Sequence, residues 1–136
     1  MSVFDHEKLD IYTLSVDFVA LANEVVEAFP RARSALADQL LRASTSVTLN
    51  IAEGAGEFAP AEKARFYRMA RRSATECAAI FDVASRLSVI SDERYQAGRQ
   101  MLLRIVAMLV RMAKRHTRSG TGTGTGTAAL DTEAGY

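Results

Sequence analysis

Tryptophan, proline and cysteine are nearly missing from this sequence of 136 residues. It has no Trp, two Pro and a single Cys, Cys77, so an internal disulfide is excluded. The best candidate for a membrane span, residues 101–112, is short and is interrupted by Arg104 and Arg111. The start of the chain lacks the basic and then apolar pattern of a signal peptide. These absences predict a cytoplasmic protein without disulfides or membrane spans.

The residues that are present are typical of one helical domain. Hydrophobic residues make up 49% of the chain and charged residues 24%, and Ala, Leu, Val and Arg are frequent. This ordinary globular composition favours helix. Because a chain of this length buries a core of its own, the sequence predicts one folded domain.

Charge is distributed unevenly along the chain. Residues 1–60 carry nine acids and four bases, whereas residues 61–118 carry five acids and thirteen bases. The formal net charge of +1 hides this difference. A basic second half indicates either a surface for an acidic partner or two halves that face each other across an interface, and both interpretations stay open.

Four segments show helical periodicity, with apolar residues at alternating spacings of three and four. The first segment ends at Phe29-Pro30, because proline disfavours helical geometry in the residue before it. The second runs over about residues 33–52. Gly54 and Gly56 are expected to stop this helix, since glycine tolerates a left-handed cap.

The second half of the chain supplies two more helices. The third is expected to begin at Pro60 and to end near Ile90, and Ser91 is the expected N-cap of the fourth. Short connections imply antiparallel neighbours. The expected core seams are, in order, Ile11, Leu14, Phe18, Leu21 and Val25; Leu36, Leu40, Ala43, Val47 and Ile51; Phe66, Ala70, Ser73, Cys77, Ile80, Ala84 and Leu87; and Tyr95, Gly98, Leu102, Ile105, Leu109 and Met112.

The sequence therefore predicts an all-α fold, an antiparallel up-down-up-down four-helix bundle over residues 1–118. Residues 119–127 are Gly-Thr repeats without an apolar side chain to bury, so residues 119–136 are expected to form a flexible tail. Two helices carry second apolar stripes, and because exposed stripes mark interfaces, the sequence also predicts self-assembly. These stripes are Tyr12, Val16, Val19 and Val26, and Met101, Val106, Met108 and Val110.

Short motifs in the second and third helices carry a resemblance to a known family. They are Phe29-Pro30, Leu40-Leu41-Arg42-Ala43-Ser44-Thr45-Ser46-Val47, Asn50-Ile51-Ala52-Glu53-Gly54, Phe66, and Ala70-Arg71-Arg72-Ser73-Ala74-Thr75-Glu76. Over about residues 4–115 the chain resembles the 23S rRNA intervening-sequence protein family of bacterial four-helix bundles. The resemblance implies assembly into ring-like pentamers. It also implies a relation to the accessory variability determinant of diversity-generating retroelements, a basic pentamer that works with a reverse transcriptase and its RNA.

Four polar residues, Arg42, Asn50, Glu53 and Glu76, lie in or next to apolar helix faces. Two carboxylates near an Arg and an Asn are the elements of an acid-base or metal site. Arg42 and Glu53, however, are about 16 Å apart along a helix, so they are not an adjacent pair. We therefore interpret the four residues as a structural polar network that fixes register and assembly.

No catalytic, cofactor-binding or metal-binding motif is recognisable in the sequence. A two-metal bundle site needs Glu-x-x-His on two helices, and His6 and His116 each lack a suitably spaced ligand. Cys77 falls on a seam position and is interpreted as a small buried core residue rather than a nucleophile. The sequence therefore predicts a protein that is not an enzyme and needs no cofactor.

Basic residues are the remaining functional signal. The third and fourth helices are expected to be neighbours, so their arginines together form a candidate phosphate-binding surface. The alternative is that these arginines are solvated or pair with acids such as Asp17, Glu24 and Glu27. Few aromatics accompany them, so base stacking is not indicated. The candidate nucleic-acid-binding residues are Arg65, Arg68, Arg72, Arg104, Arg111, Arg115 and Arg118.

Two functions are consistent with these patterns. The first is a pentameric homo-oligomer, a scaffold or adaptor whose basic surface binds RNA or DNA as an accessory to a reverse transcriptase. The second is a protein-protein interaction or structural module that binds no nucleic acid. In both cases the chain partners with itself and not with a membrane.

Overall fold

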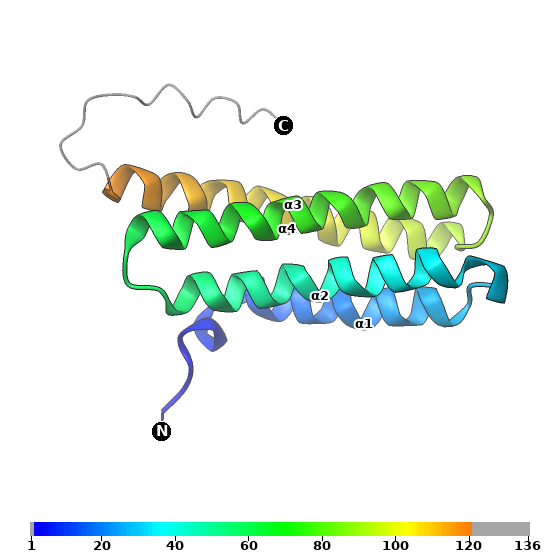
Figure 1. Ribbon diagram of the computed structural model, residues 1–136, viewed down its shortest axis with the longest axis horizontal. Coiled ribbons are helices and arrows are strands. Elements are labelled where there is room, and N and C mark those ends of the chain that lie inside the picture. Colours follow the sequence, from blue (N-terminus) through cyan, green and yellow to red (C-terminus); the bar gives the residue numbers. More distant parts are fainter. Residues whose placement is uncertain (1, 121–136) are drawn as a thin grey trace.

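The structure is a computed structural model that describes residues 2–120, with side chains up to residue 117. Its four helices form an antiparallel up-down-up-down bundle (Figure 1). Short 3-10 turns, Asp5–Lys8 and Arg31–Arg33, precede the first and second helices. The predicted all-α four-helix fold is confirmed. The predicted tail was residues 119–136, but the fourth helix continues through residue 120, and residues 121–136 lie outside the described residues. The helices are α1 (Asp10–Glu27), α2 (Ser34–Gly56), α3 (Pro60–Arg86) and α4 (Asp92–Gly120).

The four helices are arranged as a square. Each helix approaches its neighbours in sequence and α1 also approaches α4, while over residues 2–120 the diagonal pairs meet through side chains in the core, such as Phe18 and Phe81. The start of α1, the α2–α3 connection and the end of α4 lie at one end of the bundle (Figure 1). The bundle therefore has four outer faces, each formed by two adjacent helices.

The core of α3 differs from its predicted seam. Tyr67, Ala74 and Phe81 are completely buried although the predicted seam omits them, and the seam residue Leu87 is exposed. Alanines flank the buried stripe of α3 on both sides. The spacing of apolar residues alone therefore did not determine which residues of α3 face the core. Within the described part of the chain, none of the helices has the combination of length and apolarity that a membrane crossing requires.

The helix α2 ends at Gly56, within the predicted Gly54-Ala55-Gly56 stop, but neither glycine forms the predicted left-handed cap. An ideal Cβ at Gly54 would lie 2.6 Å from Cε1 of Tyr67. Glycine is needed here because α2 and α3 approach closely, not because the backbone is left-handed. The end of α2 is capped by Lys63 of α3, whose Nζ donates to the carbonyls of Gly54 and Ala55 at 3.0 and 2.9 Å.

The connection between α3 and α4 is longer than predicted. The third helix begins at Pro60, as predicted, but it ends at Arg86 rather than near Ile90. Ser88 then adopts a left-handed backbone conformation, with φ 59°, that reverses the chain. The predicted N-cap of α4 is confirmed, because Ser91 Oγ accepts a hydrogen bond from the backbone N–H of Arg94 at 3.2 Å.

The second apolar stripes of α1 and α4 are less exposed than the sequence predicts. Five of their members pack, partly buried, against the core: Tyr12, Val26, Met101, Val106 and Met108. Because the side chains of the square bundle cover these stripes in part, α1 and α4 leave less apolar surface for an interface than expected.

Candidate nucleic-acid interface

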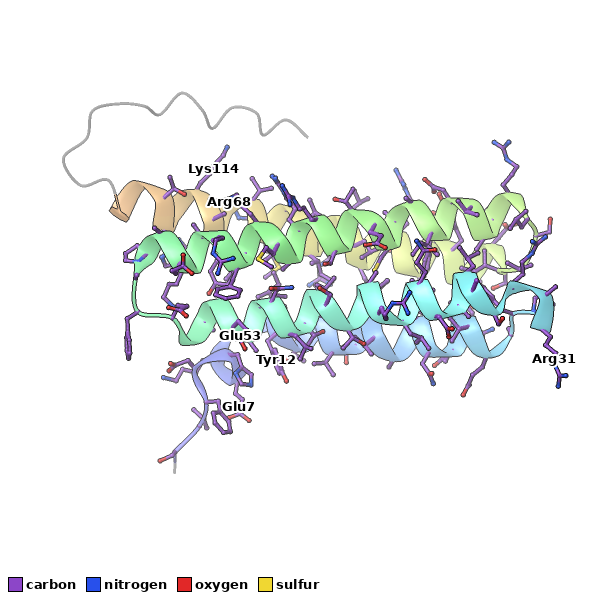
Figure 2. The ribbon with its side chains drawn as sticks, viewed as in Figure 1. Glu7, Tyr12, Arg31, Glu53, Arg68 and Lys114 are labelled. Carbon is purple, nitrogen blue, oxygen red and sulfur yellow. The ribbon has the colours of Figure 1, made fainter. Side chains whose placement is uncertain are left out.

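Basic side chains gather where α3 and α4 meet. Arg68 reaches from α3 to α4, where its Nη1 donates to Thr117 Oγ1 over 3.5 Å. Arg72 follows Arg68 by one turn and is exposed, and Lys114 lies on the same side of the bundle as Arg68 (Figure 2). Arg99 lines a pocket between the same two helices. We call this outer surface, which carries Arg68, Arg72, Arg99 and Lys114, the α3–α4 face.

The pocket on the α3–α4 face has a volume of about 190 Å³ and a polar side formed by Asp82, Tyr95 and Arg99. Tyr95 Oη donates a hydrogen bond to Asp82 Oδ1 over 2.7 Å. This hydrogen bond raises the pKa of Tyr95, so the hydroxyl remains protonated and its hydrogen stays on the side of Asp82. Arg68, Thr75 and Asp82 recur at heptad spacing along α3, so the pocket continues the row that begins at Arg68.

Arg65 is occupied within its own helix. Its guanidinium lies 2.9 Å from a carboxylate oxygen of Glu62, and its Cζ lies 4.6 Å from the centre of the Phe66 ring. The hydrogen bond from Arg65 lowers the pKa of Glu62, so the pair stays ionised and its charges compensate. Arg65 therefore adds little positive charge to the α3–α4 face.

Arg104 and Arg111 lie on the other side of α4. The contact that identifies the side facing α1 is between Arg94 and Glu24, whose charged groups are 3.7 Å apart. At about 100° per residue, Arg104 lies about 80° from Arg94 and about 100° or more from the pocket-lining positions of α4, whereas Arg111 points outward between Arg94 and Leu103. Asp17 precedes Glu24 by one heptad and extends the acidic row of α1. On this side, Glu24 of α1 therefore already pairs with one arginine of α4, Arg94.

Arg115 is not a member of the α3–α4 face. Burial raises the pKa of Tyr67 and lowers the pKa of His116. Arg115 lies near both groups, and its positive charge lowers the pKa of each. The side chain of Arg118 lies outside the described residues. The six predicted arginines whose side chains are described thus do not form one surface. The periodicity of α4 indicated a basic side but not which neighbouring helix this side faces. For this reason Arg99 and Lys114 were not among the predicted residues.

A small polar network joins α2 to α3 on a different face. Ser73 Oγ donates to Ser46 Oγ at 2.9 Å, and Asn50 Nδ2 donates to the carbonyl and hydroxyl oxygens of Ser46 at 2.9 and 3.0 Å. Of the predicted structural network, only Asn50 takes part. Its partner is Ser46, which in turn accepts the hydrogen bond of the predicted seam residue Ser73.

The other three members of the predicted network, Arg42, Glu53 and Glu76, are exposed and flank the Ser46–Ser73 contact at helical spacing. Within residues 2–117 no hydrogen bond or ion pair joins them to one another or to Asn50. They do not satisfy each other inside one chain, because they point outward from α2 and α3. Exposed apolar side chains occur at the same outward positions: Leu49, Met69, Val83 and Leu87. We call this surface, with its three charged residues, the α2–α3 face.

The cysteine and the two histidines of the chain pack against other side chains. Cys77 is completely buried, as predicted, and burial raises its pKa to about 12, which keeps the thiol protonated and unreactive. His6 packs against Tyr12 with ring centres 4.5 Å apart, and His116 lies 5.8 Å from the ring of Tyr67. Among the residues whose placement is described, no three His, Cys, Asp or Glu side chains are grouped to hold a metal ion.

A protein-family model matches most of the chain. The family is described as 23S rRNA-intervening sequence protein, and the match covers residues 7–111. This range includes α1, α2, α3 and most of α4. A search of curated protein sequences finds no match. The resemblance carried by the motifs of the second and third helices is therefore confirmed.

Proposed function

The chain belongs to the 23S rRNA-intervening sequence protein family, and we propose that it is a non-enzymatic, self-assembling module whose α3–α4 face binds RNA or DNA. The observation that carries the proposal is the charge of this face. Arg68, Arg72, Arg99 and Lys114 are all exposed there. Lys and Arg side chains neutralise phosphates and release their counterions, which supplies sequence-independent affinity.

The side of α4 that faces α1 supports this assignment by contrast. Arg94 is in contact with Glu24, and Asp17 precedes Glu24 by one heptad on α1, so acids border this side of α4. Carboxylates repel a phosphate and compensate nearby cations, so a nucleic-acid strand gains less there. The α3–α4 face is therefore the better phosphate-binding surface.

The α2–α3 face supports self-assembly. Leu49 and Val83 are 58% and 46% exposed, which is unfavourable for apolar side chains that remain in water. Exposed charges of both signs, Arg42, Glu53 and Glu76, accompany them, so one copy presents complementary groups to another. We propose the ring of five chains that the family resemblance implies. A ring repeats the α3–α4 face and strengthens strand binding through avidity.

The same resemblance supplies the biological partner of the proposal. A reverse transcriptase and its RNA are the partners of the related accessory proteins, so we propose that this chain holds RNA for such an enzyme. We also propose that the protein acts in the cytoplasm, because bacterial RNA is located there.

The salt dependence of binding tests the proposed function. A fluorescent single-stranded RNA of about twelve nucleotides is titrated with the full chain, and anisotropy is followed. Four phosphate contacts give a log–log slope near −3, so affinity is expected to fall roughly fifty-fold between about 50 and 200 mM salt. A strand with uncharged methylphosphonate linkages is the control and is expected not to bind.

Absent binding at low salt, or affinity that does not change with salt, would contradict the proposal. The second function, a protein-protein interaction module, would then be favoured, because the exposed apolar side chains of the α2–α3 face are independent of the basic residues.

A further inference from the structure

The pocket on the α3–α4 face has the size of one small ring. Its walls are mostly apolar and come from Ala78, Phe81, Leu102, Leu103 and Val106. An apolar protein cavity of about 150 Å³ accepts benzene, and sites for larger organic ligands usually exceed about 300 Å³. A volume of about 190 Å³ therefore suits a single six-membered ring better than a fused ring pair.

The polar side of the pocket presents an acceptor next to a donor. Asp82 Oδ1 already accepts the hydrogen bond of Tyr95, while in the described part of the chain Oδ2 accepts none. Arg99 borders the same pocket and offers guanidinium N–H groups. The complementary ligand has an amino donor beside a ring acceptor, which is the Watson–Crick edge of cytosine. Uracil and thymine have a carbonyl oxygen in place of the amino group, and this oxygen would face the carboxylate.

The position of the pocket connects it to the phosphate-binding residues. Arg68, Thr75 and Asp82 recur at heptad spacing, so successive positions of this row are about 10 Å apart along α3. A strand whose phosphates contact Arg68 and Arg72 thus passes the mouth of the pocket. The base must be unpaired to enter, because in a duplex its Watson–Crick edge is already used.

We propose that this pocket binds an unpaired cytosine of a single strand held on the α3–α4 face. The inference rests on the proposed function and adds a base preference to it. Asp82 accepts the amino group, Arg99 donates to the ring acceptor, and the apolar walls exclude water from the ring. The Asp82 carboxylate repels phosphate and so lowers the general affinity of the α3–α4 face. Its position beside four cations is explained if it selects one base.

The test compares two labelled strands of equal length, oligo(U) and the same strand with one central cytosine. The full chain is expected to bind the cytosine strand about tenfold more tightly. Asp82→Ala and Val106→Phe, which remove the acceptor and fill the pocket, are each expected to abolish this difference while oligo(U) remains bound. Asp38→Ala removes an exposed acid of α2 and is the control for net charge, and it is expected to keep the tenfold difference.

Thermal melts confirm that each variant is folded before its binding is compared. Equal affinity of the unchanged protein for the two strands would overturn the cytosine assignment alone, as would a preference that survives both pocket substitutions. Loss of binding to both strands would overturn the proposed function as well. A change in oligomer mass caused by Val106→Phe, without any base preference in the unchanged protein, would show that a protein side chain fills the pocket instead.

Discussion

Replacing Gly98 by alanine is expected to lower the free energy of unfolding by about 1–3 kcal/mol. An ideal Cβ at Gly98 would penetrate the Phe81 ring at Cε2. The ring cannot move aside easily, because Phe81 is 1% exposed and packs against Phe18 with ring centres 5.7 Å apart. The better helix propensity of alanine offsets only about 1 kcal/mol of this clash. Thermal unfolding at a fixed protein concentration measures the effect as a drop in Tm of several degrees.

Gly56→Ala is the matched control for this substitution. Gly56 is also helical, but an added Cβ meets no atom within 4 Å. Alanine there loses less backbone entropy on folding than glycine, so Tm is expected to stay constant or to rise slightly. If both variants melted like the unchanged protein, the close packing of α4 on Phe81 would be wrong.

Replacing Arg68 and Arg72 together by glutamine is expected to weaken strand binding about tenfold or more at low salt. Each lost phosphate contact reduces the salt slope by about 0.7, so the double variant should have a slope about 1.4 units shallower. Both side chains are exposed, and the one hydrogen bond given up is that of Arg68 to Thr117, so stability should change little. Anisotropy titrations over a range of salt concentrations measure both quantities.

Arg104→Gln with Arg111→Gln is the control with the same change of net charge. These arginines do not line the pocket of the α3–α4 face, so the double variant is expected to retain most of the affinity and the salt slope. A loss as large as that of the Arg68 and Arg72 variant would show that net charge, and not the α3–α4 face, determines binding.

The fold could be predicted from the sequence where bulky residues form one narrow stripe. In α1, α2 and α4 such residues, for example Phe18, Leu40 and Ile105, occupy the seam and are completely buried, as predicted. In α3, alanine is apolar enough for either side of the inward stripe, so the burial of Tyr67 and Phe81 depended on contacts with other helices. The need for glycine at position 54 depended in the same way on the close approach of Tyr67.

The candidate site could be predicted only in part, because it depends on how α4 is rotated about its axis. Arg68 and Arg72 were found from their spacing on one helix. The contribution of Arg99 and Lys114 could not be predicted, because the sequence does not show which side of α4 faces α3. The pocket results from packing around Asp82 and Tyr95, residues that no sequence motif connects.

The role of the α2–α3 face in assembly is tested with a pair of matched substitutions. Leu49→Glu places a charge on this face, whereas Val16→Glu makes the same kind of change at an exposed position of α1. Native mass spectrometry of the full chain is expected to show dissociation for the first variant and an unchanged assembly for the second.

Native mass spectrometry of the unchanged full chain, with and without a short single-stranded RNA, tests self-assembly and strand binding together. The expected result is a mass five times that of the chain, which increases by that of whole strands when RNA is added at low salt. A single-chain mass that does not change when RNA is added would contradict both parts of the proposed function.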